Sequence, residues 1–344
     1  MYIWQSDARW EESMFRNILV PLDGSLRAER TLSVAARIAR GRNATVTLVR
    51  VVYPQPEVGS YMIPAVLPND ALAEREEQEA HDYLNDIAAG EILHGVAVKT
   101  AVGIGAPSQV ILDTIRETRA DGVVIGSHGR TGLSRWALGS VAQAIVRHSG
   151  APVLLLRQQG PALGDDEAHA RPLRILVPLD GSELAEAALG PAQLLGEAVS
   201  APDGYTLHLV RVIQYPNTVG ADPARDKARA DAQAYLTGLA ERFGVAAPVT
   251  TSVALDEDPA DALARMTRPG QQVVGAPDAD GYDLIAMATH GRSGLARLAI
   301  GSITERVLSA TVAPALIVRP DAMKTDSRRD SAIRQNDTPL GAHR

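Results

Sequence analysis

The chain has 344 residues, which is more than twice the usual domain length and predicts two compact domains. Its residues are 45% hydrophobic and 22% charged, a composition that argues against a coiled-coil or disordered polypeptide. It contains no cysteine, which excludes disulfides, thiolate metal sites and a cysteine nucleophile. The 34 Lys and Arg residues against 41 Asp and Glu residues leave a net charge of −7, and no dense basic segment occurs, so no nucleic-acid partner is expected.

The sequence pattern also argues against membrane insertion and export. No apolar run approaches the about 18 consecutive residues that span a bilayer. Residues 1–14 are polar and acidic and lack the apolar core of a signal peptide. We therefore expect a cytoplasmic protein that has no membrane partner.

Short apolar runs alternate with helix-period stretches along the first half of the chain. The apolar runs are typical of buried strands and occur at residues 18–22, 46–52, 96–102, 122–126 and 152–157. Between them, apolar residues recur at helical spacing in residues 27–40, 71–89, 108–118 and 140–148. This alternation predicts a parallel sheet with helices on both faces.

The second half of the chain repeats the first. NILVPLDGS at residues 17–25 returns as RILVPLDGS at residues 174–182, and Gly126–Arg157 shares 13 of 32 aligned residues with Ala288–Arg319. The second copy is shorter in the connection that is residues 53–70 of the first, and longer around residues 271–280, so we expect both to be surface connections. The predicted fold is two tandem doubly wound five-stranded parallel sheets, with helices on both faces.

The repeat also sets the expected domain bounds. Residues 15–158 form the first domain and residues 172–320 the second. The segment between them, residues 159–171, is rich in Gly, Ala and acidic residues and is expected to be a linker. We expect residues 1–14 to be an extension and the polar residues 321–344 to be a disordered tail.

Ligands of doubly wound sheets bind beyond the carboxyl ends of the strands, where the strand order reverses. The first strand of each half is followed by LDGS, in which Asp23 or Asp180 could accept hydrogen bonds from sugar hydroxyls. The fourth strand is followed by a glycine segment, residues 126–130 or 288–292, and then by a Gly-Ser pair that opens a helix. Glycines and a helix N-terminus present backbone N–H groups to an anion. Together these features predict a nucleotide crevice in each half.

Both halves resemble the universal stress protein family, whose ATP-binding members carry the signature G, two residues, G, nine residues, then G followed by S or T. The first half matches at Gly126, Gly129, Gly139 and Ser140. The resemblance covers residues 15–158 and 172–320. It implies the adenine-nucleotide alpha-hydrolase-like fold, ATP as the ligand with or without Mg²⁺, and a nucleotide-dependent regulator of the stress response rather than an enzyme.

The resemblance also implies a role for each matching position. Asp23 would contact ribose, Val51 or Val52 would approach adenine through the backbone, and the glycine segment would hold phosphates. The implied set in the first half is Pro21, Leu22, Asp23, Val51, Val52, Gly126, Ser127, His128, Gly129, Arg130, Gly139, Ser140 and Val141. In the second half it is Pro178, Leu179, Asp180, Val212, Ala288, Gly291, Arg292, Gly301, Ser302 and Ile303. Ala288 stands where the signature has Gly, so we expect weaker binding in the second half.

Structural roles compete with these ligand roles. The Asp of LDGS could form a turn before the helix. Ser140 with Gln143, and Ser302 with Glu305, have the spacing of a capping box. We favour ligand contact for Asp23 and Asp180 because both copies keep the residue beside a glycine segment, and we interpret His128 as ordering its loop.

Three functions remain open: a regulatory ATP-binding protein, which we favour, a slow ATP hydrolase, and a nucleotide-free interaction scaffold. Against hydrolysis, the sequence has no Walker A motif and no evident general base beyond Asp23 or Asp180. The resemblance also implies pairing through the final strands, residues 153–157 and 315–319, which predicts an intrachain pseudo-dimer and leaves open whether two chains associate further as a homodimer. The expected partners are an adenine nucleotide and an unidentified protein.

Overall fold

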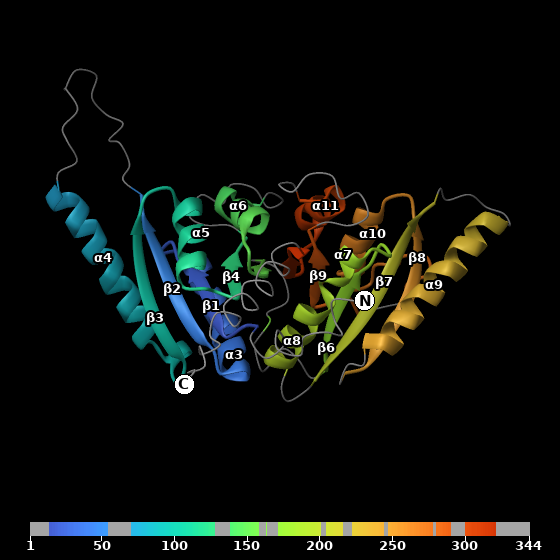
Figure 1. Cartoon of the computed structure of the whole chain (residues 1–344), viewed down its shortest axis with the longest axis horizontal. Helices are drawn as coiled ribbons and strands as arrows, with labels where there is room; N and C mark the ends of the chain where they lie inside the picture. Colours follow the sequence, from blue (N-terminus) through green and yellow to red (C-terminus); the bar gives the residue numbers. More distant parts are fainter. Residues whose placement is uncertain are drawn as a thin grey trace, which may run out of the picture.

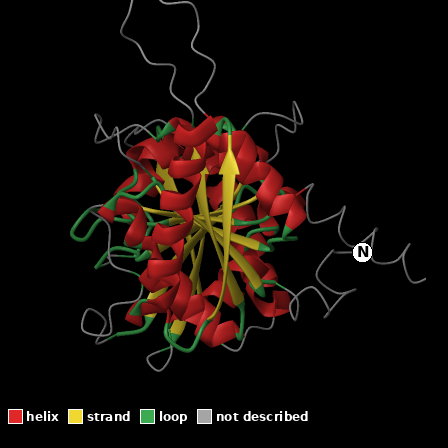
Figure 2. Cartoon of the chain, turned by 90° about the vertical axis from the view of Figure 1, so that its left-hand side faces the viewer, coloured by secondary structure: helices red, strands yellow, loops and turns green. Residues whose placement is uncertain are grey.

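The computed structural model describes residues 14–53, 70–127, 138–157, 163, 171–200, 204–215, 222–243, 247–277, 280–289 and 300–320, and the side chains of residues 70–72 are left aside. Within these residues the chain forms two similar halves that lie side by side, each a twisted sheet covered by helices (Figure 1). Seen from the end of the molecule, the helices surround the strands on both faces (Figure 2). The predicted fold class is confirmed.

The first half alternates strands and helices in the predicted order. Its elements are β1 (Asn17–Pro21), α2 (Leu26–Glu29), α3 (Thr31–Arg42), β2 (Thr45–Val52), α4 (Asp70–Ala89), the 3-10 turn η2 (Glu91–Leu93), β3 (Ala97–Ile104), α5 (Pro107–Glu117), β4 (Gly122–Gly126), α6 (Ser140–His148) and β5 (Val153–Leu156). The predicted helix over residues 27–40 is divided into α2 and α3 around Arg30.

The second half repeats this order. Its elements are β6 (Leu173–Pro178), α7 (Glu183–Glu186), α8 (Leu189–Val199), β7 (Tyr205–Gln214), α9 (Pro223–Phe243), β8 (Val249–Asp256), α10 (Pro259–Met266), β9 (Leu284–Ala288), α11 (Ser302–Ala310) and β10 (Ala315–Val318). No helix in the described ranges combines the length and the apolar character that crossing a membrane requires.

The two sheets join into one ten-stranded sheet of order β3-β2-β1-β4-β5-β10-β9-β6-β7-β8. All pairs within each half are parallel, and the joining pair, β5 with β10, is antiparallel. The expected pairing of the final strands within one chain is therefore confirmed. Each of these strands covers the apolar edge of the other, which removes two exposed sheet edges.

A pseudo-two-fold axis runs through this seam. Leu154 pairs with Leu316, its own equivalent 162 positions later in the repeat. On one face of the sheet, α3 packs against α8, where a Cβ added to Gly41 would lie 2.5 Å from the carbonyl oxygen of its equivalent, Ala198. Equivalent residues meet at both places, which is the geometry of an isologous dimer built into one chain.

The hydrophobic core forms one layer on each face of the sheet, and each layer continues across the seam. Leu154 and Leu316 belong to the layer beneath α3, α4, α8 and α9. Leu155 and Ile317 belong to the layer beneath α5, α6, α10 and α11. Because alternate residues of a strand point to opposite faces, both layers hold the halves together.

The two connections that differ in length between the copies were both expected to lie on the surface, and the structure tests this expectation for the second of them. The shortened connection corresponds to residues 53–70 of the first half, of which residues 54–69 lie outside the described residues. The lengthened one, around residues 271–280, is more than a surface connection: Val273 is buried, and the carbonyl oxygen of Val274 accepts a hydrogen bond of 2.9 Å from the N–H of Leu255 on β8. The insertion thus covers part of the edge strand of the sheet.

Replacing Gly41 by Ala should destabilise the protein, although Ala is normally the better helix former by about 1 kcal/mol. The added methyl group would press against backbone atoms of Ala198, at 2.5 and 2.9 Å, and overpacking of this kind costs about 1–3 kcal/mol. Gly238 in α9 is the matched control, because a Cβ added there meets nothing within 4 Å. Urea unfolding should show a loss of stability for Gly41→Ala and a gain of up to about 1 kcal/mol for Gly238→Ala. Equal gains would contradict close packing of α3 on α8.

Candidate functional site

Those predicted site residues that the structure describes lie where the strand order reverses in each half. β1 lies between β2 and β4, and Leu19 on β1 is in register with Val123 on β4. Asp23 and Ser127 each follow four residues later, so they stand at the same carboxyl edge of adjacent strands. In the second half, the pairing of Leu176 with Ile285 places Asp180 beside Thr289 in the same way. The structure therefore brings the LDGS turn and the start of the glycine segment together twice.

Asp23 and Asp180 each close a turn at this edge. Asp23 Oδ1 accepts hydrogen bonds from the N–H of Ser25 (3.0 Å) and from its hydroxyl (2.6 Å), while the glycine between them has a φ of +81°. Asp180 Oδ1 accepts the same two bonds from Ser182, at 2.9 and 2.6 Å. The turn that competed with ligand contact in the sequence is thus confirmed, and a ribose contact by the same carboxylates stays a prediction.

The helices after β4 and β9 start one residue earlier than the capping-box interpretation requires. The N-caps are Gly139 and Gly301, and neither described helix start has a side-chain cap bond. Each glycine is fixed to the end of the preceding strand, because Gly139 N–H donates to Ser127 O (2.9 Å) and Gly301 N–H to Thr289 O (2.6 Å). The capping-box prediction is therefore wrong, since Ser140 and Ser302 are already the first helical residues.

This geometry leaves the helix starts facing the edge of the sheet. The first N–H groups of an α-helix have no acceptor within the helix, so α6 and α11 present donors and a positive dipole end there. Glycine is required at the second of these caps, because a Cβ on Gly301 would lie 2.9 Å from Thr289 O. Each half therefore has a helix start tied directly to the strand end beside the Asp turn.

The other described site residues lie along the same edge. Leu22 and Leu179 follow the ends of β1 and β6 and donate to Val49 O and Val210 O, both at 2.8 Å. The remaining described residues are Pro21 and Pro178 at the ends of β1 and β6, Val51 and Val52 at the end of β2, Val212 on β7, Gly126 and Ala288 at the ends of β4 and β9, and Val141 and Ile303 in the first turns of α6 and α11. The predicted residues His128, Gly129, Arg130, Gly291 and Arg292 lie outside the described residues.

Beside the LDGS turn lies a group of three polar side chains that recurs in both halves and that the sequence motifs did not reveal. In the first half, the Arg50 guanidinium lies 4.6 Å from the centre of the Tyr83 ring, and Tyr83 donates a 2.9 Å hydrogen bond to Glu29. Burial and this bond to Glu29 raise the pKa of Tyr83 well above its usual range, so the phenol stays a donor. A Cβ added to Gly24 would lie 3.4 Å from the Arg50 guanidinium, which therefore supports the turn.

The second half repeats this group as Arg211, Tyr235 and Glu186. The Arg211 guanidinium lies 5.9 Å from the Tyr235 ring centre, and Tyr235 donates a 2.8 Å hydrogen bond to Glu186. The two sets tie the first βα turn to the long helices α4 and α9. Comparing the two copies residue by residue would have found them, because all three positions keep their residue type in the repeat.

The comparison with known families identifies both halves. The model of the universal stress protein family matches residues 14–157 and residues 173–319. The chain belongs to the universal stress protein family. The two matched segments contain the two halves of the sheet, so this universal stress protein has two family units in tandem.

Some known universal stress proteins match most of this chain, and others match only one half of it. A universal stress protein of Mycobacterium tuberculosis is 27% identical over 308 residues, which are 88% of this chain and 96% of the relative. One of Methanocaldococcus jannaschii is 31% identical over 157 residues, covering 46% of this chain and 91% of that protein. The crystal structure of a universal stress protein from Archaeoglobus fulgidus covers 89% of this chain and is itself covered to 98%, with a TM-score of 0.63 at 17% identity, a likeness of fold.

Proposed function

We propose that this universal stress protein binds adenine nucleotides at the carboxyl edge of each half of its sheet and acts as a nucleotide-dependent regulator. The observation that carries the proposal is the double occurrence of one arrangement. In both halves an Asp turn and a glycine-tied helix start stand on adjacent strands at the switch point. Doubly wound sheets bind their ligands at this place.

The described residues fit a nucleotide. Asp23 and Asp180 use Oδ1 for their turns, and a carboxylate has further acceptor positions for ribose hydroxyls. The starts of α6 and α11 supply N–H donors for phosphate oxygens. Val51, Val52 and Val212 would meet the adenine, and the glycine segments would wrap the phosphates.

The proposal favours regulation over catalysis. The Asp23 and Asp180 carboxylates each accept two hydrogen bonds in their turns and would also accept the ribose hydroxyls, so the proposed binding mode uses them to hold the sugar rather than to take a proton from an attacking water. ATP binding that changes shape or partners needs no such base. An assay of phosphate release decides between the two, since steady turnover that is lost in Gly129→Ala would establish the slow hydrolase instead.

The first experiment is mass spectrometry of the nucleotide released by denaturing the purified full chain, with its stoichiometry. One or two adenine nucleotides per chain are expected, and repeating an ATP titration with EDTA shows whether Mg²⁺ accompanies ATP. If no nucleotide is released and ATP leaves the melting temperature unchanged, the chain is an interaction scaffold instead.

Ala288 provides a prediction about the second site. Ala288 stands at the end of β9, where the first half has Gly126, and its methyl group would obstruct close approach of a ligand. Ala288→Gly should therefore tighten binding in the second half by about tenfold, and Gly126→Ala should weaken binding in the first half by a similar factor, the lower end of the range for one methylene group in a binding pocket. Isothermal titration of both full-length variants checks this. Unchanged affinities in both would show that the position does not limit binding.

A further inference from the structure

Arg50 of β2 packs flat against the LDGS turn of the first half. A Cβ added to Gly24 would lie 3.4 Å from Nη2 of Arg50 and 3.5 Å from both its Cζ and its Nη1. Three nearly equal distances mean that the plane of the guanidinium faces the glycine. Gly24 has a φ of +81° and its equivalent Gly181 a φ of +87°, a conformation that favours glycine. The middle of the turn therefore has no side chain of its own, and Arg50 packs in its place.

Two further residues fix the position of this guanidinium. Arg50 Cζ lies 4.6 Å from the centre of the Tyr83 ring, within the range of a cation–π contact. The Tyr83 hydroxyl donates its hydrogen bond to Glu29, the last residue of α2. This short helix leaves the turn directly, because Ser25 is its N-cap. The group therefore holds the turn both at its glycine and at the helix that follows it.

The second half builds the same group at its own LDGS turn. Glu186, which accepts the hydrogen bond from Tyr235, is the last residue of the short helix α7, and Ser182 caps α7 as Ser25 caps α2. Glu186 is only 3% exposed, a degree of burial that carboxylates reach almost exclusively when they are paired. The two turns are therefore supported in the same way, by an arginine from the second strand of each half and a tyrosine from its long helix.

The group lies between the two places where the nucleoside is proposed to bind. Val51, proposed to meet adenine, follows Arg50 on β2, and Asp23, proposed to meet ribose, precedes the glycine of the turn. Burial contributes most to the raised pKa of Tyr83, followed by its bonded glutamate, and the charge of Asp23 raises this pKa further. The Asp23 carboxylate is thus within electrostatic reach of the group, and the second half repeats this arrangement.

We propose that Arg50 and Arg211 are positioning residues for ribose recognition, each holding its Asp turn where the carboxylate accepts hydrogen bonds from the sugar hydroxyls. This inference rests on the proposed function, and it uses only the sugar side of the site, all of which the structure describes. Asp23 and Asp180 touch the sugar, whereas the arginines act through the turn. Each half then selects ribonucleotides over nucleotides without sugar hydroxyls, because a covered carboxylate that lacks its hydrogen-bond donors weakens binding.

Titration of the full chain with ATP and with 2′,3′-dideoxy-ATP, which lacks both sugar hydroxyls, tests the inference. Asp180→Ala removes the sugar contact of the second half, so that only the first half distinguishes the two ligands. ATP should then bind there about tenfold or more tightly than the dideoxy analogue, as expected for hydrogen bonds to a charged group. Adding Arg50→Met should reduce this ratio to about twofold or less, with the affinity for the dideoxy analogue changed by less than about twofold.

Two further variants separate positioning from general damage to the site. Tyr83→Phe keeps the ring beside the guanidinium but removes the bond to Glu29, so it should lower the ratio by less than Arg50→Met does. Asp23→Ala with Arg50→Met should bind ATP within about twofold of Asp23→Ala alone, because both changes act on the same hydrogen bonds to the sugar. If thermal melting shows that Arg50→Met does not fold, Tyr83→Phe decides instead.

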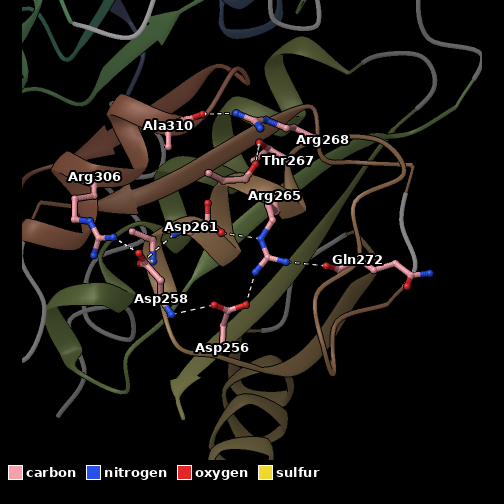
Figure 3. A network of polar contacts seen from close by, with 11 residues as sticks. Asp256, Asp258, Asp261, Arg265, Thr267, Arg268, Gln272, Arg306 and Ala310 are labelled. Carbon is pink, nitrogen blue, oxygen red and sulfur yellow. Dashed lines mark hydrogen bonds and ion pairs between the residues drawn. The ribbon is translucent and has the colours of Figure 1, made fainter. Parts of the chain in front are cut away.

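Arg265 of α10 is the matched control in the second half. It is another paired arginine near the carboxyl edge of the sheet, bonded to Asp256, to Asp261 (2.8 Å) and to the backbone oxygen of Gln272 (2.9 Å), as Figure 3 shows. None of these three partners belongs to the LDGS turn. In the chain that keeps only the sugar contact of the second half, Arg211→Met should remove the preference for ATP, and Arg265→Met should leave it within about twofold.

The outcomes separate this inference from the proposed function. A ratio that falls with Arg50→Met and with Arg211→Met, but not with Arg265→Met, supports the inference. Ratios that survive both arginine changes overturn it and leave nucleotide binding intact. Equal losses of affinity for ATP and the dideoxy analogue also overturn it, because the arginines then serve the base, the phosphates or the site as a whole. A wild type that binds both ligands equally well overturns it too, whereas a chain that binds neither ligand overturns the proposed function.

Discussion

Leu155→Lys should uncouple the two halves and lower the stability of the protein by at least about 3 kcal/mol. Leu155 is 0% exposed, lies on β5 opposite Ala315 of β10, and belongs to the core layer that crosses the seam. The substitution removes a buried leucine and leaves an ammonium group among apolar side chains. Calorimetry should show one cooperative transition for the wild type, and an earlier or divided transition for the variant.

A second variant is available at the symmetry-related residue Ile317, and an exposed leucine, Leu26, serves as the control. Ile317 is the equivalent of Leu155 across the axis and is also buried, so Ile317→Lys should have the same effect. Leu26→Lys makes a similar change of side chain at a residue that is 80% exposed, and should alter stability by less than about 0.5 kcal/mol. A single unshifted transition in both seam variants would show that the halves fold without depending on this contact.

The elements that the sequence predicted best are those with a strong local signal. Apolar runs such as residues 18–22 and 122–126 mark buried parallel strands, because no polar face interrupts them. The repeat placed the Asp turns and glycine caps at equivalent edges, and the family resemblance supplied the pairing of the final strands. The register of that pairing, Leu154 opposite Leu316, depends on contacts 162 residues apart and has no local signal.

Features missed at the candidate site depend on long-range contacts. The N-cap of α6 is Gly139 rather than the expected Ser140. Gly139 N–H donates a hydrogen bond to the end of a strand twelve residues earlier, a contact that residue spacing alone does not show. The Arg50, Tyr83 and Glu29 group joins three separate elements.

His208→Gln should remove a component of acid sensitivity worth roughly 3 kcal/mol. His208 on β7 is 4% exposed, and its Nδ1 and Nε2 lie 2.7 and 2.8 Å from the hydroxyls of Thr250 and Ser252. Burial and then the charge of Arg174 lower the pKa of His208 to about 4. An unfolded histidine has a pKa of about 6.5, so between these values the unfolded chain binds the additional proton and stability falls as the pH falls.

Asp121 acts in the opposite direction over nearly the same range of pH. Burial raises the pKa of Asp121 to about 6, against hydrogen bonds from the backbone N–H groups of Asn17 and Arg16. The folded protein therefore holds this proton more tightly than the unfolded chain, whose Asp has a pKa of about 3.9. The resulting stabilisation is complete below pH 4 and is lost as the pH rises through 6.

The pH dependence of the stability of the wild-type protein contains the contributions of both His208 and Asp121, so single variants are needed to separate them. Urea unfolding at pH 7, 5.5 and 4.5 should show that His208→Gln gains stability relative to the wild type as the pH falls, because its side chain does not titrate. Asp121→Asn should lose stability relative to the wild type over the same interval. Parallel curves for the wild type and His208→Gln would mean that the imidazole takes up its proton with the same pKa in the folded chain as in the unfolded chain, with Thr250 and Ser252 both accepting hydrogen bonds from its N–H groups.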